Sequence, residues 1–93
     1  MVCIIIERHI AEGFASYFDK MSQQVLSEAT VQQGFVSGSS FHNSYDENHR
    51  VVIAKYDSIQ DWQRWHSSDE RQQIMANLLP MLQSDEKITV LEH

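Results

Sequence analysis

The spacing of apolar residues changes several times along the chain, and each change predicts a different element. Residues Val2–Ile10 (VCIIIERHI) are rich in β-branched side chains and predict a first strand. Beyond this segment the apolar residues recur at helical spacing, which predicts an amphipathic helix over Glu12–Val31. The apolar stripe of this helix consists of Phe14, Tyr17, Phe18, Met21, Val25 and Leu26.

Two strands are expected next, and they are close enough in sequence to form an antiparallel hairpin. Gly34–Ser44 predicts the second strand, although a glycine at position 38 and several serines weaken it. Arg50–Tyr56 (RVVIAKY) predicts the third. The polar segment Asn43–Asn48 between them is typical of a turn.

Two capping signals follow the hairpin. Ser58 stands three residues before Asp61, and Ser67 stands three residues before Glu70. A serine followed at this distance by an acidic residue is typical of the first turn of a helix. The two signals therefore predict a short helix, a break near residue 67 and a second helix, at Ile59–His66 and Asp69–Gln83.

The last part of the chain completes the order of elements. Pro80 lies inside the second of these helices and should kink it or mark its last turn. Lys87–Leu91 (KITVL) predicts a final strand. The resulting order β-α-β-β-α-β predicts an α+β, ferredoxin-like split β-α-β fold: a four-stranded antiparallel sheet with helices on one face.

Two of the strands lack the alternation that a half-exposed strand should show. Val2–Ile6 and Val51–Ala54 are continuous apolar runs, which are typical of strands covered on both faces. The helices can cover only one face, and no loop is long enough to cross the other. A domain of this size also gains stability from a partner. We therefore expect a homodimer that packs sheet against sheet.

Length and composition narrow the class of protein. The 93 residues suffice for one domain, expected at residues 1–90. Leu91-Glu92-His93 resembles the start of a vector-encoded histidine tag and is excluded from the functional argument. A single cysteine, Cys3, excludes an internal disulfide and is expected to be a small buried apolar residue.

Charge and hydropathy bear on partners and location. The net charge is −6 and no stretch clusters Lys or Arg, so no nucleic-acid partner is expected. The longest apolar run has five residues, against the roughly 20 that cross a bilayer. With no membrane span and no charged, apolar and small-residue signal segment before it, the expected location is the cytoplasm.

The segment Tyr56–Arg71 (YDSIQDWQRWHSSDER) carries a resemblance to a known family. Its aromatic residue, capping serine, tryptophan pair Trp62 and Trp65 and following Ser-x-Glu resemble the antibiotic-biosynthesis-monooxygenase family of dimeric α+β barrels. Further matching positions are Gly13, Gly34-Phe35-Val36 and Leu79-Pro80-x-Leu82. The resemblance implies a dimer with one pocket in each subunit, between the helices and the sheet.

The resemblance also implies a choice of activities. Members of the family include cofactor-free oxygenases of quinols and anthrones, haem-degrading monooxygenases and an isomerase of a signalling sugar. The haem-degrading branch uses an Asn on the first strand, the second tryptophan, and a His about ten residues after it, nearly three helical turns. This chain has Ile6-Glu7 at the place of the Asn and Met75 at the place of the His. Haem degradation is therefore the third of the function hypotheses.

The leading hypothesis is a cofactor-independent monooxygenase that oxidises a small aromatic, quinol-like substrate with O2. Such chemistry needs an electron-rich substrate, a base and an apolar pocket. Trp65 is the candidate for stacking on the substrate, with Glu7 or His66 as candidate base. Plainer alternatives are a tryptophan in the core, a histidine that stabilises a helix end, and a glutamate paired with a base such as Arg8. The competing class is a non-catalytic, small-ligand-binding dimeric module.

Several assignments stay open. Alternation alone does not tell which face of the first strand carries Glu7 and His9. His42 and His49 flank the predicted turn without a tight ligand spacing, so a solvated turn is expected and no metal site. The apolar residues expected to form core, pocket lining or both are Phe14, Phe18, Met21, Tyr56, Met75 and Leu78.

Overall fold

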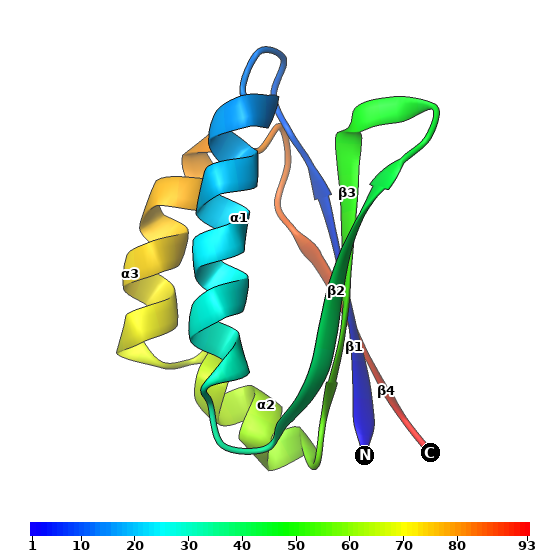
Figure 1. Ribbon diagram of the computed structural model, residues 1–93, viewed down its shortest axis with the longest axis vertical. Helices are drawn as coiled ribbons and strands as arrows, with labels where there is room; N and C mark the ends of the chain where they lie inside the picture. The colour runs from blue at the N-terminus through cyan, green and yellow to red at the C-terminus, as the bar shows by residue number, and fades with distance from the viewer.

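A four-stranded antiparallel sheet carries all the helices on one of its faces (Figure 1). The computed structural model describes residues 1–93. The strands lie in the order β2-β3-β1-β4, with bounds β1 Val2–His9, β2 Phe35–Asn43, β3 Asp46–Tyr56 and β4 Lys87–Glu92. The helices are α1 Ala15–Thr30, α2 Ile59–His66 and α3 Asp69–Leu78, followed by the 3₁₀ turn Leu79–Met81.

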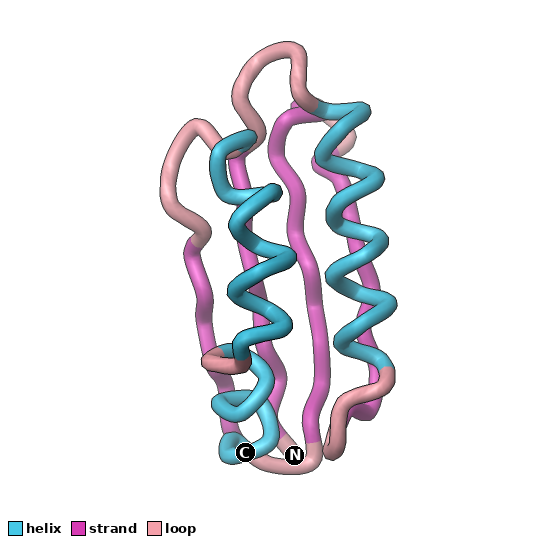
Figure 2. The backbone as a smooth tube through the Cα atoms, turned by 90° about the vertical axis from the view of Figure 1, so that its left-hand side faces the viewer, coloured by secondary structure: helices cyan, strands magenta, loops and turns pink.

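The predicted α+β, ferredoxin-like arrangement is confirmed. Helices α1 and α3 lie side by side along the strands and form the second layer (Figure 2). None of the helices combines the length and the apolar character needed to cross a membrane.

The alternating burial of strand β1 shows which face of the sheet the helices cover. Its burial alternates, so that Val2, Ile4 and Ile6 are buried under the helices while Cys3 and Ile5 are only half-buried. Glu7 belongs to this second set, and the face that it occupies is therefore the one opposite the helices. His9 follows the same phase. Glu7 and His9 therefore both lie on the face of the sheet opposite the helices.

The hairpin between β2 and β3 is tighter than expected. The turn predicted over Asn43–Asn48 is confirmed in place but is shorter, because β3 begins at Asp46 and only residues 44 and 45 form the turn. The Asn43 carboxamide oxygen accepts a hydrogen bond from the Tyr45 backbone N–H at 2.8 Å, and the Asp46 carboxylate accepts one from the Asn48 backbone N–H at 3.0 Å. These local bonds satisfy the backbone of a short turn, so strand pairing continues close to it.

Two helix boundaries differ from the prediction for backbone reasons. Helix α1 begins at Ala15 rather than Glu12, since Gly13 has φ +88°, a left-handed conformation incompatible with a right-handed helix. Helix α3 ends at Leu78 rather than Gln83 and passes into the 3₁₀ turn that contains Pro80. Proline has no N–H to donate and tolerates only the first positions of a helix.

The capping serines are partly as predicted. The Ser58 hydroxyl accepts a hydrogen bond from the Asp61 backbone N–H at 3.2 Å, which confirms the cap of α2. The cap of α3 is Ser68 and not Ser67, since the Ser68 hydroxyl accepts from the Arg71 backbone N–H at 3.2 Å. Ser67 instead ends α2, and its hydroxyl donates to the Gln63 carbonyl at 2.8 Å.

Replacing Ser68 by alanine should therefore destabilise the protein more than replacing Ser67. We expect Ser68→Ala to lower the free energy of unfolding by about 1 kcal/mol, because the first turn of α3 loses its acceptor. Ser67→Ala, which removes an exposed bond within the last turn of α2, serves as the matched control. Urea denaturation of both variants checks this, and a larger loss for Ser67→Ala would reverse the capping assignment.

Candidate ligand-binding cavity

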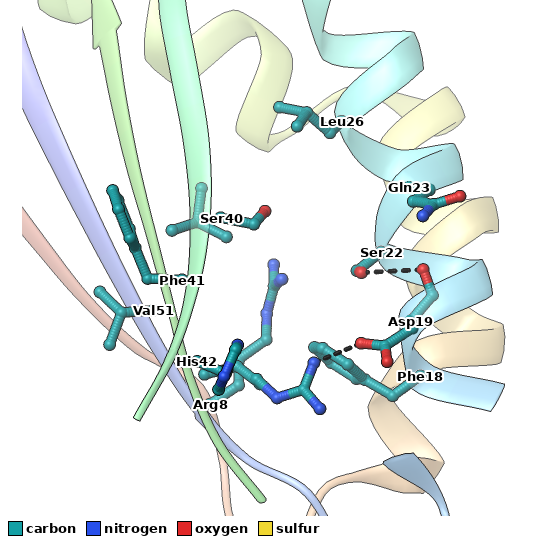
Figure 3. A pocket seen from close by; sticks show the side chains of 12 residues that line it. Arg8, Phe18, Asp19, Ser22, Gln23, Leu26, Ser40, Phe41, His42 and Val51 are labelled. Carbon is teal, nitrogen blue, oxygen red and sulfur yellow. Dashed lines mark hydrogen bonds and ion pairs between the residues drawn. The ribbon is translucent and has the colours of Figure 1, made fainter. Parts of the chain in front are cut away.

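A cavity of about 310 Å³ lies between α1 and the helix-covered face of the sheet at β2 and β3 (Figure 3). Small-molecule sites start at about this volume. The wall formed by α1 includes Phe18 and Ser22, and the wall formed by the sheet includes Ser40, His42 and Arg50. Both walls thus carry polar and apolar side chains.

A narrower extension of about 40 Å³ continues the cavity toward α2. The two parts share Arg8, Ser22 and Ser40 among their lining residues, so they adjoin. The narrow part has an aromatic end formed by Tyr56, Trp62 and Trp65. The cavity as a whole runs from a polar wide part to an aromatic inner end.

An ion pair joins the two walls of the wide part. Arg50 on β3 contacts the carboxylate of Asp19 on α1, and its guanidinium carbon lies 5.7 Å from the centroid of the Phe18 ring (Figure 3). The Asp19 side chain is 51% exposed, and ion pairs in such settings contribute little to stability. This contact therefore shapes the cavity without locking it closed.

Two buried arginines share one carboxylate beside the narrow part. Nε of Arg8 on β1 lies 2.9 Å from Oε2 of Glu86, and an Nη atom of Arg71 on α3 lies 3.3 Å from its Oε1. The side chains of Arg8 and Arg71 are 3% and 6% exposed, and that of Glu86 is 12% exposed. The cluster ties β1 and α3 to the segment that leads into β4.

Burial and pairing set the charges of this cluster. Burial alone would raise the pKa of Glu86, but attraction to Arg8 and Arg71, with their hydrogen bonds, lowers its pKa below the ordinary value. Burial lowers the pKa of Arg8, against the attraction of Glu86; arginine remains protonated at neutral pH all the same. The cluster is therefore fully ionised at neutral pH.

The aromatic end packs edge to face. Tyr56 lies 5.5 Å from Phe35 and 5.6 Å from Trp62, measured between ring centroids. Burial raises the pKa of Tyr56 to about 12, against the opposing effect of Arg71. Its phenol is therefore neutral at physiological pH and remains a hydrogen-bond donor.

Three of the predicted site residues lie in the cavity wall. Trp65 and Tyr56 line the narrow part, and Phe18 lines the wide part. Four others do not line it. Met75 and Leu78 are buried in the core, Met21 packs against the core, and Phe14 is 43% exposed at the start of α1.

The two predicted bases lie away from the cavity. Glu7 projects from the opposite face of the sheet, with its carboxylate oxygens 3.5 Å from His49 Nε2 and 4.0 Å from Lys87 Nζ. His66 ends α2 and is exposed, with its ring 5.1 Å from that of Trp62. Partial burial, with the nearby Arg71, lowers the pKa of His66.

His42 and His49 flank the turn as expected, and His42 is exposed, whereas His49 is half-buried. Both residues lie within strands, and the register puts them on opposite faces of the sheet. His42 lines the wide part of the cavity, whereas His49 stacks on His9 on the other face, with ring centroids 4.7 Å apart. No group of three or more His, Cys, Asp or Glu side chains converges in the structure.

The sequence reasoning missed the charged residues of the cavity, although two of them left a signal. Arg8 follows Val2, Ile4 and Ile6 in the buried phase of β1. Arg71 begins the buried series that continues through Met75 and Leu78 at helical spacing. A charged residue in the apolar phase of a strand or helix marks a buried, paired charge. No comparable pattern marks Glu86, which lies in a loop.

Fold and cavity together define the class: a ferredoxin-like α+β domain with a small-molecule cavity between its helices and its sheet. The chain belongs to the antibiotic biosynthesis monooxygenase family, whose sequence pattern it matches over residues 1–77. Membership of this family supports a monooxygenase-type or small-ligand-binding role. A search of curated protein sequences finds no match.

Solved structures with the same fold are similar over almost the whole chain. A crystal structure of an antibiotic biosynthesis monooxygenase aligns with TM-score 0.91 and 10% identity, covering 100% of this chain and 98% of its own. SnoaB, a cofactor-independent oxygenase from Streptomyces nogalater, aligns with TM-score 0.82 and 15% identity, covering 99% and 94%. Rv0793 from Mycobacterium tuberculosis aligns with TM-score 0.88 and 15% identity, covering 99% and 93%.

The charge cluster predicts an acid-sensitive contribution to stability. At neutral pH, Glu86→Gln should lower the free energy of unfolding by about 3 kcal/mol, because it leaves two buried arginines without their counter-charge. The folded-state pKa of Glu86 lies below its ordinary value, so its contribution is complete above that value and is lost as the pH falls through the folded pKa. The difference between wild type and variant should therefore shrink in acid.

Urea denaturation at a series of pH values, from neutral into acid, measures the difference in the free energy of unfolding between the wild type and Glu86→Gln. Glu28→Gln, which neutralises an exposed glutamate on α1, is the matched control and should change stability little at any pH. A wild-type-to-Glu86→Gln difference that is small at neutral pH, or that grows in acid, would contradict the assignment of a paired carboxylate.

Proposed function

We propose that the protein is a cofactor-independent monooxygenase that oxidises a small, electron-rich aromatic substrate of the phenol or quinol type with O2. The observation that carries this proposal is the cavity itself, which leads from a polar wide part to an end formed by Tyr56, Trp62 and Trp65. Family membership and the fold shared with a cofactor-independent oxygenase support it.

The reaction balances without an external reductant. An aromatic substrate with an activated C–H bond gives up two hydrogens and gains a carbonyl oxygen, so the substrate supplies all four electrons. One atom of O2 enters the product and the other leaves as water. The substrate must first lose a proton, since its anion passes an electron to O2 more readily. An apolar, enclosed site admits O2 and keeps water from the intermediate.

Four residues have roles in this proposal. The planar substrate lies in the wide part, Trp65 and Trp62 form the inner end that its edge contacts, and the neutral phenol of Tyr56 donates a hydrogen bond to a substrate oxygen. His42 is the proton acceptor, because it is the histidine that lines the wide part and a neutral imidazole has a ring nitrogen that accepts a proton. The roles predicted above for Glu7 and His66 as bases stay predictions.

A small-ligand-binding module without catalysis is the second candidate. The observation that favours it is the position of Glu7 and His66, neither of which lines the cavity. In this case His42 contributes polarity to the cavity and takes no proton.

Oxygen uptake with a panel of hydroquinones, phenols and anthrones tests the proposal. We expect His42→Ala to lower kcat about 100-fold or more, since positioned acid–base groups contribute at least this factor. Trp65→Phe should raise KM, because it reduces the stacking surface and removes the indole N–H. His66→Ala should leave kcat nearly unchanged.

The activities of the three variants distinguish the candidate bases. Loss of activity in His66→Ala with full activity in His42→Ala would transfer the role of base to His66. Uptake by the wild type no faster than the uncatalysed rate, for every compound, would overturn the oxygenase in favour of the binding module.

We also propose that two copies pack through the sheet faces opposite the helices. This face is apolar at the centre of the sheet, where Ile5 on β1 pairs with Ile53 on β3. Cys3 and Val51 lie on the same face. Ile53 is 37% exposed in the single subunit. Covering such a patch removes apolar surface from water, which stabilises a dimer.

Ile5→Glu should therefore convert the dimer to a monomer. The substitution places a charge at the centre of the proposed interface, where a second copy would bury it unpaired. Val31→Glu is the matched control, because Val31 is 75% exposed at the end of α1 and far from this face in the fold. Size-exclusion chromatography with light scattering measures the mass. A monomeric wild type, or a dimeric Ile5→Glu, would contradict the proposed interface.

A further inference from the structure

We propose that Arg8 and Arg71 form an oxyanion subsite in the cavity, which selects ligands that carry an ionised oxygen on a planar ring. The inference deepens the proposed function and rests on it in one respect, namely that the cavity takes an aromatic molecule. It names the charge state in which that molecule binds.

The first argument is the balance of charge. Two guanidinium groups share the single carboxylate of Glu86, which leaves one positive charge uncompensated in a buried cluster. Both arginines line the narrow part of the cavity, and Glu86 does not. The one acidic residue in the cavity wall, Asp19, is already paired with Arg50. The excess charge therefore faces the space that a ligand would occupy.

The second argument is the set of donors without partners. Nε of Arg71 is buried and has no hydrogen-bond partner. Arg8 contacts Glu86 through Nε, which leaves the Nη groups of its guanidinium turned into the space between the sheet and α1 (Figure 3). A buried donor without an acceptor is unfavourable. An oxyanion placed there supplies the missing acceptor and the missing charge together.

The third argument is the aromatic surroundings, which select a planar ligand. The guanidinium carbon of Arg71 lies 5.9 Å from the ring centroid of Trp62, so cation and aromatic face are already stacked. Trp65 and Tyr56 line the same narrow part. A ring held in the wide part, with its edge toward these side chains, would direct an attached oxygen into the narrow part and toward the two arginines.

The subsite has a consequence for the proposed reaction. A positive charge in a site of low dielectric favours the ionised form of a bound phenol and so lowers the pKa of the ligand. Arg8 and Arg71 thereby prepare the anion that reacts with O2, whichever group receives the proton. They are positioning and charge-stabilising residues, distinct from the proposed base His42.

A chromogenic phenol tests the subsite without any turnover. The anion of a nitrophenol is yellow and the neutral form is not, so absorbance reports the ionisation of the bound ligand directly. We expect the pKa of nitrophenol bound to the wild type to fall by about one unit or more, a tenfold change in its ionisation constant. An unchanged or raised pKa of the bound phenol would overturn the proposal, and so would the absence of saturable binding.

Variants of the cluster should act in opposite directions. Arg8→Met and Arg71→Met should each cancel most of the shift, whereas Arg64→Met, which removes the same charge from an exposed site on α2, should not. Glu86→Gln increases the uncompensated charge, so it should lower the bound pKa further although it weakens the fold. A purely structural cluster predicts that Glu86→Gln impairs binding as the arginine variants do, and that outcome would overturn the subsite.

A pair of isosteric ligands supplies a test on the wild type alone. 2-Naphthoate and 2-naphthylmethanol have the same ring, and only the first carries an oxyanion at neutral pH. We expect at least about tenfold tighter binding of the carboxylate, about 1.4 kcal/mol, measured by quenching of tryptophan fluorescence. Equal affinities would overturn the proposal.

The outcome is separable from that of the oxygenase assay. Anion preference with no oxygen uptake for any compound would leave the subsite standing and remove the monooxygenase. Oxygen uptake that is insensitive to Arg8→Met, with no preference between the two naphthyl ligands, would leave the monooxygenase standing and remove the subsite.

Discussion

The ion cluster of Arg8, Glu86 and Arg71 is the constraint on which the rest of the structure depends. Charges as deeply buried as these are costly unless paired, so the three side chains must meet for the fold to form. Their meeting brings β1, α3 and the segment before β4 together. The same contact places two arginines in the wall of the cavity, so the element that stabilises the fold also gives the site its charge.

Strand β2 presents small residues to α1. Gly38 and Ser40 lie on the helix-covered face of this strand, opposite Ala54 and Val52 of β3. A Cβ at Gly38 would lie 3.0 Å from a methyl carbon of Leu26, so even an alanine there would crowd α1. Gly38 thus lets Leu26 of α1 pack close to the strand, and Ser40 lines both parts of the cavity.

The two faces of the sheet separate two roles. The face under the helices carries the cavity and the buried charges, while the opposite face carries Ile5, Ile53 and the stacked pair of His9 and His49. A strand side chain changes face with every residue, so neighbours such as Glu7 and Arg8 belong to different environments. Whether a glutamate on β1 can reach the cavity therefore depends on which alternate set of its side chains the helices cover.

Local patterns in the sequence determined the order of elements, the helix Ile59–His66 to the residue and the fold class, because caps, periodicity and β-branched runs act over a few residues. The resemblance to the family, and not these local patterns, indicated Trp65 as a pocket residue, and Tyr56 lines the same part of the cavity. The faces of the strands, the partner of Arg8 and the place of His42 were decided only by tertiary structure. Glu86 lies 78 positions from Arg8 in the chain, and no pattern of neighbouring residues encodes a contact between such distant segments.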